Sequence, residues 1–119
     1  MPRILIAGKH WTARALLRAQ LIEEGFDIEA HEDVQSADRS LWASKIMPHL
    51  LIADLFESET PAKDVERLSR WVEHVPIWVL AGHATGEVAA LEGRGFERVL
   101  YRPLDMGKLV QEAKQRLAR

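Results

Sequence analysis

Short apolar runs alternate along the chain with longer segments in which apolar residues recur every three or four positions. The short runs are typical of β-strands, and the longer spacing is typical of amphipathic helices. The predicted strands cover residues 3–7, 26–30, 49–54, 76–80 and 96–101. The predicted helices cover residues 11–24, 34–46, 61–72, 85–92 and 106–117. A helix therefore follows each strand, and the chain shows no linker or internal repeat.

Strands that alternate with helices predict a parallel sheet with helices on both faces. The third run, residues 49–54, is almost entirely apolar, as suits a strand that is covered on both sides. We therefore predict an α/β fold of the flavodoxin-like class. It is a doubly wound (βα)5 unit with strand order 2-1-3-4-5, formed by one domain over residues 1–119. A Rossmann-type fold is the main alternative. It typically has a glycine-rich phosphate-binding turn after the first strand, and residues 8–11 do not have that pattern.

Several residues mark the expected helix ends. Gly25 is placed to end the first helix in a left-handed conformation, and Pro48 closes the second. Thr60 is a candidate N-cap, followed by Pro61 at the first helical position. Asp105 is expected to cap the last helix.

Composition narrows the possible functions. The chain has 119 residues, of which 47% are hydrophobic and 29% charged, with a formal net charge of −2. This balance supports a globular core and gives no electrostatic footprint for nucleic acid or an anionic membrane. The chain has no cysteine, which is compatible with a reducing compartment, and its first apolar run is too short for a signal peptide or a membrane span. We expect a cytoplasmic protein.

Charged side chains follow several of the predicted strands at their carboxyl ends. Asp54 ends the third strand, Lys9 follows the first and Arg102 follows the fifth. Because the carboxyl ends of parallel strands meet at one crevice, we expect Asp54 to face both cations, and an Asp54–Lys9 ion pair to fix this end of the sheet. Trp11 opens the first helix near the crevice and is expected to cover Asp54.

These segments resemble the receiver domains of bacterial two-component response regulators over nearly the whole chain. Residues 48–54 resemble the third strand of that family, which ends in the phospho-accepting aspartate, here Asp54. Residues 75–81 resemble the fourth strand. Arg102 and Pro103 resemble the Lys-Pro pair that closes the fifth strand, and the resemblance implies a cis bond between them.

The departures from the family pattern concern its phosphorylation chemistry. Gly8 and Lys9 stand where the family has two acidic residues that help the aspartate to hold Mg²⁺, and Ala81 stands where a hydroxyl contacts the phosphoryl group. A lysine ammonium about 4 Å from a bound metal would be repelled by roughly 4 kcal/mol per unit charge at an effective dielectric constant of about 20. Millimolar binding is worth only about 4 kcal/mol. We therefore predict weak or absent Mg²⁺ binding and no other cofactor.

The resemblance implies a signalling module rather than an enzyme. We predict a pseudo-receiver that acts through contacts with a histidine kinase, a phosphotransfer protein or an output protein, with a possible homodimer through the face between Thr85 and Leu117. Two alternatives stay open. Asp54 could accept phosphate with Lys9 and Arg102 in place of the metal, or the crevice could belong to an anion- or nucleotide-binding flavodoxin-like module.

Two further features carry weaker predictions. His10 and His83 follow strands and could join Asp54 in a transition-metal site, although the nearby cations argue against it. Gly86 and Gly93 each lower the intrinsic stability of the predicted fourth helix by about 1 kcal/mol relative to alanine, so that helix is a candidate for movement or docking. Ser40, Ser44, Ser58 and Ser69 have no base partner at a recognisable spacing.

Overall fold

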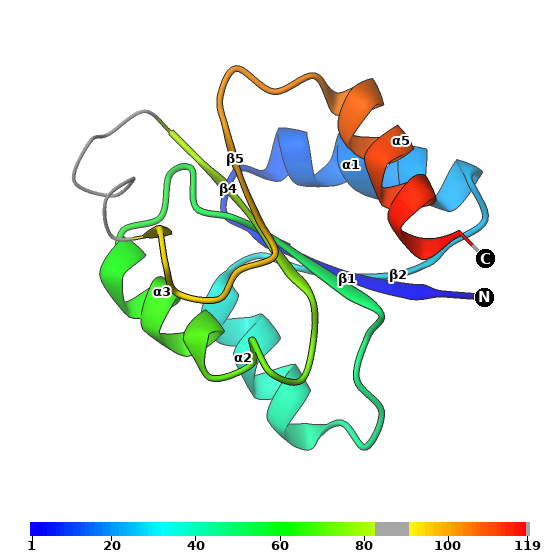
Figure 1. Cartoon of the computed structure of the whole chain (residues 1–119). Coiled ribbons are helices and arrows are strands. Elements are labelled where there is room, and N and C mark those ends of the chain that lie inside the picture. The colour runs from blue at the N-terminus through cyan, green and yellow to red at the C-terminus, as the bar shows by residue number, and fades with distance from the viewer. Residues whose placement is uncertain (83–90, 119) are drawn as a thin grey trace.

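Five strands and four helices make up residues 1–82 and 91–118, the part of the chain that the structure, a computed structural model, describes (Figure 1). The strands are β1 (Arg3–Gly8), β2 (Asp27–His31), β3 (Leu50–Asp54), β4 (Ile77–Ala81) and β5 (Arg98–Tyr101). The helices are α1 (Trp11–Glu23), α2 (Val34–Ala43), α3 (Pro61–Ser69) and α5 (Met106–Leu117). Each overlaps its predicted segment. The predicted helix over residues 85–92, with Gly86 and the neighbouring His83, falls almost wholly outside the described residues.

The strands form one parallel sheet in the order β2-β1-β3-β4-β5. This order confirms the predicted flavodoxin-like class and differs from the order of Rossmann-type folds. The register sets the residue Gly8 beside Asp54 at the carboxyl ends of β1 and β3, and Ala81 beside Tyr101 at the ends of β4 and β5. The ends that were expected to form a crevice therefore lie side by side.

Helices cover both faces of the sheet, α1 and α5 on one face and α2 and α3 on the other (Figure 1). Because side chains alternate along a strand, each central strand feeds two separate cores. Ile52 of β3 packs in the core under α1 and α5, whereas its neighbours Leu51 and Ala53 pack in the core under α2 and α3. Trp78 of β4 is almost fully buried in the first of these cores, as its place in the middle of an apolar run predicts.

Most predicted helix ends are confirmed. Gly25 has φ +93°, and the Asp105 carboxylate accepts the Lys108 backbone N–H at 3.0 Å. The helix α2 ends three residues earlier than predicted, because Ser44 is extended and its hydroxyl bonds to the backbone of Ile46. The helix α3 ends at Ser69, and turns rather than helix continue to residue 74.

Within the described residues, no helix has both the length and the apolar character needed to cross a membrane.

Candidate functional site

The crevice is organised by strand parity, the alternation of side chains between the two sheet faces. Gly8 and Asp54 are register partners, so they point to the same face as Ile6 and Ile52. Arg102 lies two residues after Leu100, which packs on that same face, and its backbone N–H donates to the Ala81 carbonyl at 2.9 Å. The chain therefore brings the Asp54 carboxylate and the Arg102 guanidinium together at the carboxyl end of the sheet, on the face that α1 and α5 cover.

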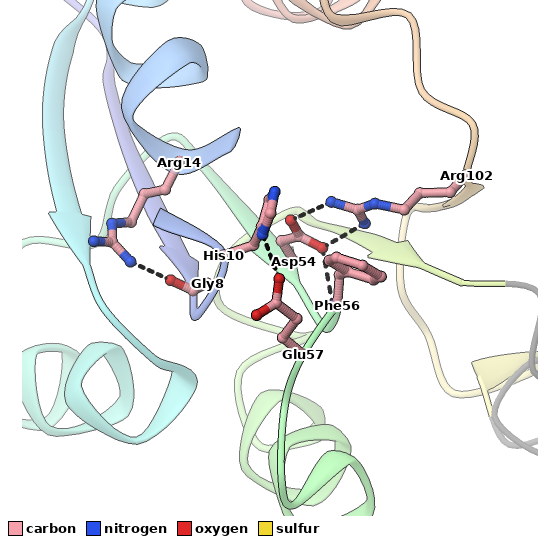
Figure 2. Close-up of polar contacts among 7 residues, drawn as sticks. All are labelled: Gly8, His10, Arg14, Asp54, Phe56, Glu57 and Arg102. Atoms are coloured by element: carbon pink, nitrogen blue, oxygen red, sulfur yellow. Dashed lines mark hydrogen bonds and ion pairs between the residues drawn. The ribbon is translucent and has the colours of Figure 1, made fainter. Parts of the chain in front are cut away.

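Arg102 forms an ion pair with Asp54 through two parallel hydrogen bonds (Figure 2). Its Nη1 donates to Oδ1 and its Nη2 donates to Oδ2, both at 2.8 Å. The Phe56 backbone N–H also donates to Oδ1 at 3.0 Å. The Asp54 side chain is only 9% exposed and that of Arg102 is 21% exposed. This fork geometry is the strong form of an arginine–carboxylate contact, and it occupies both oxygens of Asp54.

An aromatic cover lies over the pair. The Phe56 ring lies 4.3 Å from the Arg102 guanidinium carbon, a distance typical of a cation–π contact. His10 meets the Phe56 ring edge-on at 5.1 Å and contacts the Glu57 carboxylate (Figure 2). The prediction that Trp11 covers Asp54 is wrong, because Trp11 is 67% exposed and Phe56 occupies that place.

The predicted Asp54–Lys9 ion pair is wrong as well. Lys9 comes one residue after the register partner of Asp54, so parity sends its side chain to the other face of the sheet. There it lines a cavity of about 180 Å³ together with Asp33, Glu59 and Arg67. Within residues 1–82 and 91–118, Lys9 forms no ion pair. Only Arg102 of the two expected cations reaches the carboxylate.

The remaining predicted positions lie around the pair. Ala81 is fully buried at the end of β4, and it offers only its carbonyl to Arg102. The bond between Arg102 and Pro103 is cis, which confirms what the family resemblance implied.

The donor set does not fit the Mg²⁺ ion that the resemblance would imply. Mg²⁺ needs oxygen ligands in octahedral geometry, usually including free carboxylates. Both oxygens of Asp54 are taken by Arg102, and the Gly8 carbonyl accepts a hydrogen bond from Arg14 at 2.5 Å. A Cβ at position 8 would lie 3.0 Å from the Asp54 Cβ, so an acidic side chain there would crowd Asp54. In the described part of the chain, no three His, Asp or Glu side chains are grouped closely enough to hold a metal. The predicted transition-metal site also needs His83, which lies outside the described residues.

A second polar network joins β2 to α2. His31 lies with Nδ1 2.7 Å from the Ser36 hydroxyl and with Nε2 2.5 Å from the Glu29 carboxylate. The hydrogen bond between His31 and Glu29 is the main cause that holds the pKa of Glu29 below its usual range. Ser40 donates a further bond to Glu29. The order Ser-His-Glu resembles a hydrolytic triad, but the Asp33 carboxylate accepts the Ser36 N–H, so this backbone donor is not available to stabilise an oxyanion. The network therefore stabilises the β2–α2 unit.

Solved structures with this architecture decide the fold. The chain matches the receiver domain of the Francisella response regulator 1452 with a TM-score of 0.79 and 14% identity, covering 98% of this chain and 96% of that one. It matches a response regulator receiver protein from Burkholderia phymatum with a TM-score of 0.78 and 15% identity, over 98% and 95% of the two chains. The chain has the receiver-domain fold. A response regulator from Thermotoga maritima gives a TM-score of 0.76 and 18% identity, over 100% and 99%. No family model matches the sequence, and no curated protein does.

Within this receiver fold, three residues that contribute to the crevice were not predicted from the sequence. Phe56 and Glu57 lie in the loop after β3, and Arg14 lies one turn into α1. Glu57 adopts φ +65°, a left-handed conformation that residues other than glycine rarely take. The residues around Phe56 in the sequence do not predict that its ring packs against Arg102, which lies far away along the chain.

Proposed function

We propose that this chain is a receiver-like signal-transduction module that acts through protein contacts and in which an arginine–aspartate pair replaces Mg²⁺-assisted phosphorylation. The observation that carries the proposal is the two-bond contact between Arg102 and Asp54. It occupies both oxygens of the carboxylate that the family uses as its phosphate acceptor. The pair also links β3 to the end of β5, so it holds this end of the sheet in one arrangement without a phosphoryl group.

Electrostatics supports the same proposal. Phosphoryl transfer needs metal ions or fixed cations to neutralise the transferred group, and the attacking oxygen must lie in line with the phosphorus. Arg102 supplies positive charge, but its Nη1 and Nη2 atoms are both held against the Asp54 carboxylate rather than against an incoming phosphoryl group. Gly8 and Ala81 contribute no acidic or hydroxyl side chain at the two neighbouring strand ends.

The receiver fold also suggests the class of partner. We expect a histidine kinase, a phosphotransfer protein or an output protein, in the cytoplasm, with no substrate turnover by the chain itself. A homodimer through the face between Thr85 and Leu117 belongs to the same expectation, and residues 83–90 of that face lie outside the described part of the chain.

Phosphate labelling tests the proposal directly. The protein is incubated with acetyl phosphate and Mg²⁺, and its intact mass is measured. We expect no phosphoryl adduct on the wild type. Arg102→Lys should become responsive to acetyl phosphate with Mg²⁺, because a lysine is a single point charge that leaves one oxygen of Asp54 free. Asp54→Asn in the Arg102→Lys background is the matched control and should remove the response.

Two outcomes would redirect the proposal. An adduct on the wild type that disappears in Asp54→Asn would show a working phosphoacceptor. A thermal shift with inorganic phosphate or a nucleotide that depends on Arg102, without any adduct, would show an anion-binding module instead.

A further inference from the structure

Two indole rings pack together where the helices α2 and α3 end. Trp42, in the last turn of α2, meets Trp71 edge-on with their ring centres 5.0 Å apart. Trp71 follows α3, which ends at Ser69, and the two helices lie side by side on one face of the sheet (Figure 1). Because each helix returns from the carboxyl end of one parallel strand to the amino end of the next, this indole pair lies at the amino end of the sheet, away from Asp54 and Arg102.

The two rings differ in their exposure to water. Trp71 is 8% exposed, and its indole donates to the Asp38 carboxylate at 2.8 Å, so this ring is fixed in place. Trp42 is 66% exposed, and Ile46, four residues further on, is 73% exposed. A large apolar side chain that rests on a fixed neighbour and faces water is the kind of residue that anchors protein contacts, because little side-chain freedom is lost on binding.

The segment that carries these apolar side chains is basic. Residues 39–53 contain no aspartate or glutamate, although the chain has 18 acidic residues. Arg39 precedes Trp42 by three residues, which makes them neighbours on the surface of α2, and Lys45 follows Trp42 by three. Both cations are exposed, and neither forms an ion pair within residues 1–82 and 91–118. Positive charge is therefore available on both sides of Trp42 along the chain.

Acidic residues on the adjoining elements offset this charge little. Asp38 is 12% exposed, and Trp71 and Arg70 both contact its carboxylate. On the neighbouring α3 side, exposed Glu66 and Glu73 stand before and after exposed Arg70 in the sequence. The excess of positive charge therefore belongs to the α2 side.

We infer that the surface formed by Arg39, Trp42, Lys45 and Ile46 binds an acidic segment of another protein. Trp42 and Ile46 contact apolar side chains of that segment, and Arg39 and Lys45 pair with its carboxylates. The inference rests on the proposed action through protein contacts, and it adds the surface and the chemistry of the partner. This surface lies at the opposite end of the sheet from the phosphate-acceptor position, so the two can be tested separately.

Two other occupants fit this surface less well. A second copy of the chain would place Arg39 and Lys45 against the same cations across a two-fold axis. An anionic membrane is a broad plane, so it would also meet exposed Glu66 and Glu73 on the α3 side, which it repels. A narrow peptide segment can lie along the α2 side alone.

Fluorescence anisotropy of a labelled peptide tests the inference. The probe is a helical peptide of about 18 residues with leucine on one face and glutamate on the other, and its counterpart has lysine in place of glutamate. We expect the glutamate peptide to bind with a dissociation constant of roughly 100 µM. The lysine peptide should bind at least about tenfold more weakly, because its charges are repelled by the same surface.

Two matched tryptophan variants locate the contact. Trp42→Ala should weaken binding of the glutamate peptide at least about tenfold, because it removes the central apolar anchor. Trp11→Ala makes the same change at a site of nearly equal exposure, and it should alter the dissociation constant by less than about twofold. Circular dichroism checks that both variants remain folded.

Charge reversal separates a local contact from a general attraction. Arg39→Glu and Lys45→Glu should each weaken binding about threefold at low ionic strength, and less at high ionic strength. Arg18→Glu changes the net charge by the same amount at an exposed position of α1, and it should alter binding by less than about 1.5-fold. A phosphoryl adduct on the wild type would overturn the proposed phosphate-independent state, whereas the peptide assay reports on the α2 surface alone.

Several results would overturn the inference. One is a glutamate peptide that shows no saturable binding up to millimolar concentration, and another is an equal loss of binding in Trp42→Ala and Trp11→Ala. Cosedimentation with phosphatidylserine vesicles that depends on Trp42, without binding of the peptide, would show a membrane surface instead. Self-association that Trp42→Ala removes, measured by sedimentation velocity without peptide, would show that a second copy occupies the site.

Discussion

Two arginine–carboxylate pairs involve the last βα unit, one at each end of the sheet: the first links it to β3, and the second lies within the unit itself. At the carboxyl end, Arg102 holds Asp54 with two bonds of 2.8 Å. At the amino end, Arg116 of α5 holds Glu97, just before β5, with bonds of 2.8 to 3.0 Å. Each carboxylate also accepts one further N–H, from the Phe56 backbone at one end and from the Trp78 indole at the other.

The pairs differ in their access to water. The Asp54 side chain is 9% exposed and that of Arg102 is 21% exposed, whereas Glu97 and Arg116 are 34% and 43% exposed. A charge that loses its partner in a buried place has little water to replace it, whereas an exposed pair is worth little because water screens it. The same chemistry should therefore be structural at the carboxyl end and marginal at the amino end.

The largest expected effect comes from breaking the buried pair. Arg102→Met keeps much of the apolar stem but removes the guanidinium, which leaves the Asp54 carboxylate buried without a counter-charge. We expect the free energy of unfolding to fall by about 3 kcal/mol, measured by urea denaturation. Adding Asp54→Asn should recover part of this loss, because the second change removes the unpaired charge.

The matched control is Arg116→Met, the same substitution at the other end of the sheet. It should cost less than about 1 kcal/mol. Equal losses in Arg102→Met and Arg116→Met would show that burial does not separate the two pairs.

The next effect in size concerns the aromatic ring at the amino end. Trp78 is almost fully buried, its indole donates to Glu97 at 2.7 Å, and Arg98 lies 5.3 Å from its ring centre. Trp78→Phe should cost about 2 kcal/mol, because it leaves a cavity and removes the hydrogen bond. Trp42→Phe, at an exposed position, should change stability by less than about 0.5 kcal/mol in the same assay. A comparable loss in both variants would contradict the buried role of Trp78.

A smaller effect is expected from the close approach of β1 to β3 at the carboxyl end. A Cβ at Gly8 would lie 3.0 Å from the Asp54 Cβ, and Arg102 prevents Asp54 from moving aside. Gly8→Ala should therefore destabilise the protein by about 1 kcal/mol. Gly82→Ala is the control, because a Cβ there meets no atom within 4 Å, and it should be close to neutral. A neutral Gly8→Ala would mean that Asp54 can shift, and that the pair holds it less firmly than the geometry indicates.

The sequence predicts the strands of this crevice better than its contacts. Apolar runs place Asp54 and Arg102 at the carboxyl ends of β3 and β5, and the strand order separates these two strands by β4 alone. The failure concerns Lys9. A strand that is buried on both faces has no apolar–polar alternation, so its sequence does not predict which face of the sheet a given side chain occupies. Once Gly8 is known to stand beside Asp54, parity alone removes Lys9 from the site. The cover by Phe56 depends on a loop conformation that short-range patterns do not specify.

The exposed pair at the amino end should show itself through pH. Hydrogen bonds from Arg116 are the main cause that holds the pKa of Glu97 below its ordinary value of 4.5, and the Trp78 indole adds to the effect. A carboxylate whose pKa is lower in the folded state stabilises the fold above its unfolded pKa, and this contribution is lost as the pH falls through the folded pKa. The free energy of unfolding should therefore decline as the pH is lowered from about 5.

Glu97→Gln should flatten that decline without abolishing it, because the pKa of Glu29 is lowered too, chiefly by its hydrogen bond with His31. Since water and salt reach Glu97, the flattening should shrink at high ionic strength. An acid decline of unchanged slope in Glu97→Gln would show that the amino-end pair contributes nothing measurable, and the contrast between the two ends would then rest on the carboxyl-end pair alone.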